Sequence, residues 1–301
     1  MDLTLSPEQE ALEKAVDAVL VRGGHLSDLG YLDVVRDAGP IEGVLVVERA
    51  AASAADGPVA ARVLTGPLAG IHDLPAGVGL LDGRSGLCRW GPVCEAFLVL
   101  DGDDALLASP DDVEVTPVAS TFGASYARVT VRHGSRVTSG DRLRRAWQVA
   151  IAAEAEGLML AAITKTALHV TERVQFGKPI GAFQAVQHRL AAAYAQAMGT
   201  RWLARRAAWY AEDEFITASA AAYACEAAAL TYQNTHQVTG AIGITTEYGL
   251  VNWTLRLLGL RQELGGQRAH ARRVALVRRA TNKPWPSPIP MPRSLAHKDE
   301  A

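Results

Sequence analysis

The residues best suited to chemistry lie between Arg173 and His188, where the sequence reads RVQFGKPIGAFQAVQH. A planar arginine suits a diphosphate, because its guanidinium presents paired donors to phosphate oxygens. Gly177 lets backbone approach a ligand closely. The run also carries two amides and two aromatic rings, at Gln175, Gln184, Phe176 and Phe183. A plain helix end would explain the glycine and the Lys-Pro that follows, but not the arginine, glutamines and phenylalanines.

A second candidate segment, QVTGAIG at residues 237–243, follows a long alanine-rich stretch. Gln237 is polar, and the backbone amides around Gly240 and Ala241 could receive a phosphate or a nucleoside at a helix end. The glycine spacing is a weak signal by itself, because an ordinary interhelix loop has the same composition.

Helices must position both segments. Ser6 is a candidate N-cap and Pro7 suits the first turn of a helix over 5–21. Apolar periodicity predicts a second helical block over 41–65. It then predicts a C-terminal bundle of four long helices and a short fifth. Those five ranges are 142–174, 181–211, 215–237, 247–263 and 267–280.

Between the helical parts, short alternating runs predict a small antiparallel β unit over 86–140. The expected strands are 96–100, 104–108, 113–118 and 126–131. Residues 67–85 are glycine-rich and are expected to form a loop. The tail from Lys283 carries five prolines and is expected to be extended or disordered.

Bulk composition bounds the function. The 301 residues carry a net charge of −2, which does not suggest nucleic-acid binding. The three cysteines, Cys88, Cys94 and Cys225, form no even disulfide framework and no metal-binding spacing, so a reducing cytoplasm is expected. The polar start has no signal-peptide pattern, and no uninterrupted apolar run reaches the ~20 residues of a membrane span.

The RVQFGKPIGAFQ run closely resembles the RxQFG-x-PI-x-x-FQ signature of the acyl-CoA dehydrogenases, flavoproteins that desaturate acyl thioesters. MDLTLSPEQEALEKAV resembles the opening helix of that family, and HQVTGAIGITTEY resembles its Q-x-x-G-G segment, with Ala241 in place of the second glycine. The resemblance implies a mainly α fold. It would comprise a shortened N-terminal helical domain (1–85), a reduced β domain (86–140), a four-helix bundle (141–282) and a Pro-rich tail (283–301).

The resemblance also implies that this signature reaches across a subunit interface to the FAD of a partner chain. Arg173 would pair with the FAD pyrophosphate, and Phe176 would pack on the cofactor. The remaining contacts would come from Gln175, Phe183, Gln184, Gln237, Gly240 and Ala241. His188 belongs to the same pattern and is expected to cap the helix that contacts FAD.

The catalytic base of the family is a glutamate at one of two positions. These positions fall on Leu264 and Trp147, and neither is a carboxylate. Glu263 is one residue away and is a weak candidate, with Glu154, Glu156 and Glu247 weaker still. The family's substrate-contacting arginine aligns with Gln148, and its TEPxxGSD-like loop is missing between Leu64 and Ser120.

These losses predict a shortened subunit of a heteromeric acyl-CoA dehydrogenase, similar to α2β2 assemblies that shorten steroid side chains in actinobacteria. A full-length partner would supply the flavin cradle, the base and most of the acyl-CoA pocket, and an electron-transfer flavoprotein would accept the electrons. The lone chain would be inactive. Two alternatives stay open: a flavin-free structural or regulatory homologue, and an autonomous homo-oligomeric dehydrogenase that uses Glu263. Trp202 and Trp209, seven residues apart, are expected in the core or at a subunit interface.

Overall fold

The computed structural model describes residues 5–22, 26 and 30–281, so the Pro-rich tail lies outside the described residues. The first helix, α1 (Pro7–Val21), begins as the sequence predicts. The Ser6 hydroxyl accepts a hydrogen bond from the Gln9 amide, and the Gln9 side chain accepts one from the Ser6 amide. This capping box satisfies two backbone donors that the helix itself leaves open.

The predicted helical block over 41–65 is interrupted. After η2 (Tyr31–Asp33) and α2 (Val34–Asp37), helix α3 runs from Pro40 to Ala52. The chain then turns through Gly57, whose φ is 115°, and Pro58 before η3 (Ala61–Thr65) and α4 (Gly66–Leu68). The left-handed Ala54, whose φ is 54°, ends α3, and Gly57 and Pro58 keep the helix from resuming at once.

Strands β1 to β7 form two sheets that share one apolar cluster. The first sheet has the order β1-β3-β4-β7 and the second has the order β2-β6-β5. Their bounds are β1 (Val78–Asp82), β2 (Ser85–Arg89), β3 (Ala96–Asp101), β4 (Asp104–Ala108), β5 (Val113–Val118), β6 (Tyr126–Val131) and β7 (Ser135–Ser139). The short η4 (Gly91–Val93) lies between β2 and β3, and η5 (Pro110–Asp112) precedes β5.

Two expectations for this region are wrong. Residues 67–85 are not all loop, because β1 begins at Val78, and the unit is not wholly antiparallel, because β1 pairs with β3 in parallel. Gly79, which made β1 look like part of a loop in the sequence, is required by packing. A methyl group on Gly79 would lie 2.7 Å from the Phe97 ring and 2.8 Å from Cys88 Sγ. Glycine therefore marks a close approach of neighbouring elements here.

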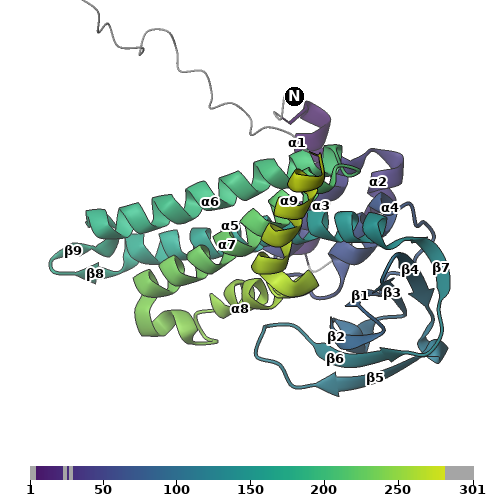
Figure 1. The fold of residues 1–301 in the computed structure, drawn as a ribbon. Coiled ribbons are helices and arrows are strands. Elements are labelled where there is room, and N and C mark those ends of the chain that lie inside the picture. The colour runs from purple at the N-terminus through teal and green to yellow at the C-terminus, as the bar shows by residue number, and fades with distance from the viewer. Residues whose placement is uncertain (1–4, 23–25, 27–29, 282–301) are drawn as a thin grey trace, which may run out of the picture.

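The C-terminal part is built on three long helices that run side by side in Figure 1, α5 (Gly140–Glu172), α6 (Gln184–Trp209) and α7 (Glu214–Thr239). The shorter α8 (Val251–Leu260) and α9 (Gly266–Thr281) complete it, with η8 (Glu263–Gly265) between them. The predicted helix over 247–263 is thus shorter than expected. The mainly α fold, with a small sheet unit between helical segments, is confirmed.

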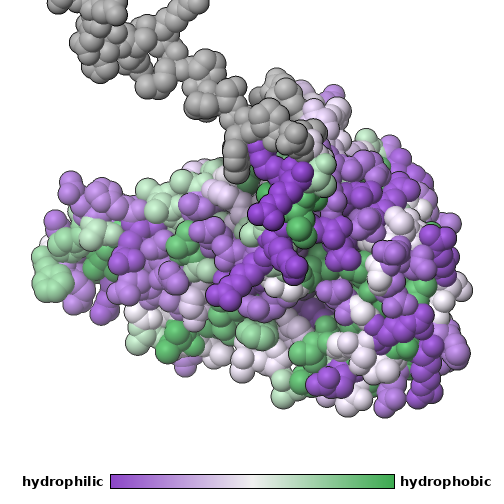
Figure 2. Space-filling model, viewed as in Figure 1, coloured by the Kyte–Doolittle hydropathy of each residue, from purple (hydrophilic) through white to green (hydrophobic). Residues whose placement is uncertain are grey.

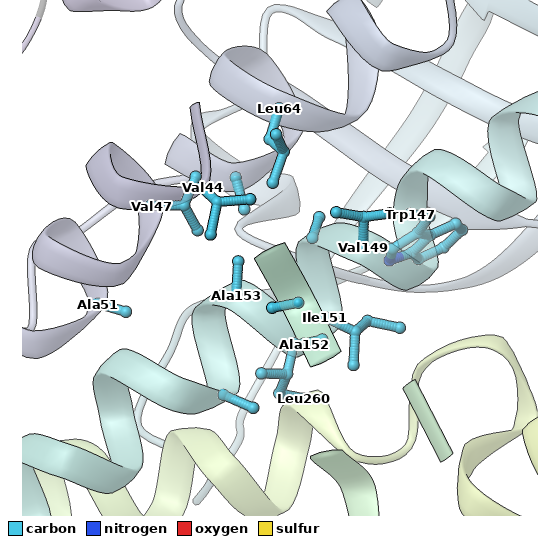
Figure 3. Packing of buried hydrophobic residues seen from close by; sticks show 14 of the residues in the cluster. Val44, Val47, Ala51, Leu64, Trp147, Val149, Ile151, Ala152, Ala153 and Leu260 are labelled. Carbon is cyan, nitrogen blue, oxygen red and sulfur yellow. The ribbon is translucent and has the colours of Figure 1, made fainter. Parts of the chain in front are cut away.

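Helix α3 packs on α5 through small and branched side chains (Figure 3). Val44 and Val47 face Ala153 across this contact. A methyl group on Gly157 would lie 2.0 Å from the Glu48 carbonyl oxygen, so glycine lets the two backbones approach. Helix α5 is long and apolar enough to cross a membrane, yet 83% of its apolar window is buried inside the protein, as in the core helix of a bundle.

Candidate functional site

The RVQFGKPIGAFQ run forms a hairpin that projects from one end of the bundle, at the left in Figure 1. Its strands are β8 (Val174–Gln175) and β9 (Lys178–Pro179), and η6 (Ile180–Ala182) leads into α6. All residues from Thr171 to Pro179 are exposed. Figure 2 shows apolar side chains at this tip of the molecule. The hairpin therefore offers its side chains outward rather than to its own core.

Phe176 is the most unusual residue of the hairpin. Its φ is 54°, and the φ of Gly177 is 79°, as in the two-residue turns with two left-handed positions. A bulky residue in this conformation costs roughly 1–2 kcal/mol relative to glycine. The Phe176 side chain is 91% exposed, and its ring touches the Phe183 ring edge-on at 6.1 Å. Folding of this chain gains little from the exposed ring, so the residue suits contact with another molecule.

Arg173 lies at the base of the hairpin, where its backbone ends α5 by donating to the His169 carbonyl at 2.9 Å. Its guanidinium is exposed and makes no hydrogen bond or ion pair to any described residue. The Gln184 side chain and the side-chain oxygen of Gln175 also have no hydrogen-bond partner among the described residues, although Gln175 Nε2 donates to the Val174 carbonyl at 2.7 Å. These groups are free to bind a phosphate and the parts of the same ligand next to it.

The second candidate segment lies at the same end of the bundle. Helix α7 ends at Thr239 and is followed by η7 (Gly240–Ile244). Tyr248, a few residues later, donates to the Lys165 carbonyl of α5 at 2.8 Å, and its ring lies 5.3 Å from the His169 ring. These contacts hold the α7–α8 loop against the last turns of α5, which lead to Arg173.

Gln237, Gly240 and Ala241 are all exposed. Gly240 has φ 62° and ψ −144°, a conformation restricted to glycine, and a methyl group there would meet nothing within 4 Å. The C-terminus of α7 lies at this segment, and its unpaired carbonyl groups carry partial negative charge. This charge disfavours a phosphate and favours a neutral group such as a nucleoside. His188 is exposed and is not the N-cap of α6, a position occupied by Phe183. The expected capping role of His188 is therefore wrong.

Glu263 belongs to a separate cluster at the junction of sheet and bundle. Arg89 Nε donates to Glu263 Oε1 at 2.7 Å. The two terminal nitrogens of Arg89 donate to the Glu154 carboxylate at 2.5 and 2.8 Å. Trp147 Nε1 donates to Glu263 Oε2 at 2.6 Å. Burial opposes the charge of Arg89, but attraction from Glu154 and Glu263 outweighs it and holds the Arg89 pKa well above its ordinary value.

Three members of this cluster, Arg89, Trp147 and Glu263, line a cavity of about 540 Å³. Its apolar lining comes from Leu80, Leu87, Val118 and Phe122 of the sheet unit and from Leu264 of η8. The volume falls in the range of small-molecule pockets, roughly 300–1,000 Å³. Burial raises the pKa of Tyr126, which also lines the cavity, to about 12.

The two positions at which the family would place its base thus meet in space, although Leu264 contributes an apolar wall and Trp147 a donor. Gln148 does not line this cavity. It lies buried inside the bundle, where its amide oxygen accepts from Thr217 at 3.0 Å and its nitrogen contacts His270 Nδ1 at 3.3 Å. Among the weaker candidates, Glu156 is buried against Arg201 at 2.6 Å and Glu247 is exposed.

Arg89 is the site residue that sequence reasoning missed. It follows Cys88 in a short strand, and its two carboxylate partners are 65 and 174 residues away. An arginine in an otherwise apolar alternating segment was the one available signal.

The cavity residues do not fit an FAD held by this chain alone. A diphosphate needs unpaired cations or amides. Among the described residues that line the cavity, Arg89 is the one cation; it is bound to two carboxylates, and Asp82 adds a further negative charge. The hairpin fits better, because Arg173 is exposed and has no ion pair with any residue that the structure describes.

Residues 147–277 match the family model described as acyl-CoA dehydrogenase, C-terminal domain. Curated relatives include acyl-CoA dehydrogenase FadE34 of Mycobacterium tuberculosis, 31% identical over 61% of this chain and 27% of the relative. Acyl-CoA dehydrogenase IpdE2 of Mycolicibacterium smegmatis is 30% identical over 61% of this chain and 58% of the relative. The chain thus spans from about a quarter to somewhat over half of the length of these relatives.

Solved structures share the fold across nearly the whole chain. One chain of the ChsE4-ChsE5 complex from Mycobacterium tuberculosis matches with a TM-score of 0.74 and 24% identity, over 94% of this chain and 100% of that chain. A Tcur3481-Tcur3483 steroid ACAD variant matches with a TM-score of 0.77 and 20% identity, over 93% of this chain and 100% of that chain. Residues 147–277 thus match the C-terminal domain of the acyl-CoA dehydrogenases, and the chain shares its fold with these solved structures.

Proposed function

We propose that this chain is a subunit of an FAD-dependent acyl-CoA dehydrogenase that completes the FAD site of a full-length partner. The observation that carries the proposal is the exposed hairpin, in which Phe176 takes a left-handed conformation and is 91% exposed. Strained residues persist where the surrounding function requires them.

In this proposal Arg173 neutralises the FAD diphosphate, and Phe176 and Phe183 cover the cofactor. Gln175 and Gln184 donate or accept around it, while Gln237, Gly240 and Ala241 contact the adenosine side. Bound FAD would accept the hydride that leaves the β-carbon of the acyl thioester. Lys178 lies 4.3 Å from the Phe183 ring, so a second cation stands near the same surface.

The partner supplies the base in this proposal. The base must reach the α-proton of the acyl group with an unengaged carboxylate. Both oxygens of Glu263 already accept hydrogen bonds, and Arg89 neutralises its charge. The isolated chain is therefore proposed to be inactive, with acyl-CoA bound mainly by the partner.

The names of similar solved structures support a proposal of two different subunits. The ChsE4-ChsE5 and Tcur3481-Tcur3483 structures contain two named chains each, and the second is called a steroid ACAD. By analogy the substrate class is a steroid or lipid acyl-CoA, and the assembly is a cytoplasmic α2β2 heterotetramer. An electron-transfer flavoprotein is the proposed electron acceptor.

The deciding experiment measures flavin. The chain is purified alone and after co-expression with a full-length acyl-CoA dehydrogenase of the same organism, and the flavin absorbance is recorded. FAD bound only after co-expression, at one FAD per heterodimer, supports the proposal. Stoichiometric FAD on the lone chain overturns it, and a flavin-free complex would favour a structural or regulatory homologue.

One observation favours the autonomous alternative, because Glu263 does line a cavity of about 540 Å³. If the lone chain desaturates acyl-CoA and Glu263→Gln abolishes turnover while FAD stays bound, the chain carries its own base. Retained turnover in the Glu263→Gln complex supports a base from the partner.

A further inference from the structure

The cavity of about 540 Å³ gathers apolar side chains that the fold leaves in contact with water. Leu87, Val118 and Phe122 line it and are 57%, 37% and 38% exposed. They come from β2, from the end of β5 and from the loop that joins β5 to β6. Single exposed apolar residues are ordinary, but several around one hollow are typical of a ligand site.

Hydrogen bonds fix the walls of this cavity. Arg89 joins β2 to Glu154 of α5 and to Glu263 of η8. Arg256 Nε of α8 donates to the Gly123 carbonyl at 2.8 Å, which holds the β5–β6 loop against α8 (Figure 1). The cavity is therefore formed before a ligand arrives, so binding loses little free energy to ordering the protein.

The charges along the cavity disfavour a charged ligand. Arg89 and Glu263 line it but neutralise each other, so neither is left for an ionic group of the ligand. Asp82 also lines the cavity and is exposed, so it repels anions but adds little for a cation that water already screens. An ion that entered would lose its hydration without gaining a counterion. The cavity therefore suits an uncharged molecule.

The Tyr126 hydroxyl supplies a polar contact for such a molecule. It lines the cavity and has no hydrogen-bond partner among the described residues. Burial raises the pKa of Tyr126 to about 12, so the phenol keeps its proton and donates it in a hydrogen bond. Gly259 leaves the hydroxyl accessible, because a methyl group there would lie 2.3 Å from it. An acceptor oxygen on the ligand would match this donor.

We propose that this cavity binds one uncharged, mainly apolar molecule, which presents a carbonyl or another acceptor oxygen to the Tyr126 hydroxyl. Such a ligand differs from FAD and from acyl-CoA, both of which carry phosphates. The inference goes beyond the proposed function, because the proposed FAD contacts lie on the hairpin and the α7–α8 loop. It applies to the chain with or without a partner subunit.

The test uses PRODAN, an uncharged naphthalene ketone whose fluorescence rises and moves to shorter wavelength in apolar surroundings. We expect the lone chain to bind one PRODAN molecule. Dimethylaminonaphthoate has the same ring and amine with a carboxylate in place of the ketone. It should bind at least about ten-fold more weakly, because its charge must leave water.

Three variants place the probe in the cavity. Leu87→Asp puts a charge in the apolar lining and should weaken PRODAN binding at least about ten-fold. Leu276→Asp, the same substitution at an exposed side chain of α9 outside the cavity, is the matched control and should bind as wild type. Tyr126→Phe should weaken binding about three-fold and move the emission further to shorter wavelength, because the ketone loses its donor. Unchanged circular dichroism shows that each variant is folded.

Equilibrium dialysis extends the test to the complex with a full-length acyl-CoA dehydrogenase of the same organism. The complex that contains Leu87→Asp should bind one PRODAN fewer than the wild-type complex. Equal binding by these two complexes overturns the inference, because the partner then covers the cavity.

The lone chain also has results that contradict the inference. Equal affinity of wild type and Leu87→Asp would mean that the probe binds elsewhere. Equal affinity for PRODAN and dimethylaminonaphthoate would refute an uncharged ligand. Displacement of PRODAN by butyryl-CoA would make the cavity an acyl-CoA pocket. FAD content reports separately on the hairpin: if Arg173→Ala leaves FAD bound while PRODAN binds as expected, the proposed FAD role fails and the cavity site stands.

Discussion

Trp147 Nε1 donates a hydrogen bond to Glu263 Oε2 at 2.6 Å, across 116 residues of sequence. One residue stands where the family places a base on its first long bundle helix, and the other lies beside the alternative position. The same carboxylate accepts from Arg89 at 2.7 Å. The cluster thus ties the sheet unit, α5 and the turn before α9 together through paired charges.

Arg89 is expected to be structural. Arg89→Met leaves two largely buried carboxylates unpaired and should lower the free energy of unfolding by roughly 3–5 kcal/mol. Urea unfolding followed by circular dichroism measures this loss. Arg84→Met is the control, because the Arg84–Asp101 pair is half exposed and should contribute at most about 1 kcal/mol. Equal losses for the two variants would contradict the cross-bracing role.

Arg173 is expected to hold the cofactor. Arg173→Ala should strip FAD from the complex and leave the stability of the lone chain unchanged, because the side chain has no partner in the described chain. Arg173→Lys should retain part of the affinity, since a lysine keeps the charge but loses the paired donors. Flavin absorbance after gel filtration measures retention, with Arg268→Ala on the exposed side of α9 as the control.

Phe176 is expected to trade stability for contact. Phe176→Asn creates the Asn-Gly pair that two-residue hairpins favour. The free energy of unfolding of the lone chain should stay unchanged or rise by up to about 1 kcal/mol, because asparagine tolerates a positive φ. Its melting temperature should therefore not fall. FAD retention by the complex should nevertheless fall. A large drop in melting temperature would mean that the exposed ring supports the fold.

His270 is expected to make the fold sensitive to acid. Burial lowers its pKa to about 4, against 6.5 in an unfolded chain. Between these values the unfolded chain binds a proton that the folded chain excludes, so the contribution of His270 to stability falls as pH falls from 6.5 to 4. The loss is about 1.4 kcal/mol per pH unit, or roughly 3 kcal/mol in all.

Urea unfolding at pH 7, 6 and 5 checks this slope against His270→Gln. The variant should be less stable at pH 7, where it loses the contact with Gln148, but should lose less with acid. Glu48 contributes to the pH dependence of stability in the opposite direction, because burial and then Glu156 raise its pKa to about 8. Both proteins contain Glu48, so its contribution cancels in the comparison. Parallel slopes for the two proteins would contradict the role of His270.

The sequence by itself determined the elements whose signals are local. The capping box at Ser6 and Gln9, the three long bundle helices and the hairpin run all follow from neighbouring residues. Strand β1 was not predicted, because a glycine such as Gly79 is typical of a loop. Only the close packing of Phe97 and Cys88 against it explains the glycine. The site residues of the hairpin stay predictions, since the cofactor and the second chain that they are proposed to contact lie outside this structure.

Only the tertiary structure revealed the charged cluster beside the cavity of this chain. Arg89, Glu154 and Glu263 lie 65 and 174 residues apart, so no spacing rule could join them. Folding brings them within hydrogen-bond distance because buried charges must be paired. The same folding turned the aromatics of α6 and the ring of Phe176 outward, where only another surface can cover them.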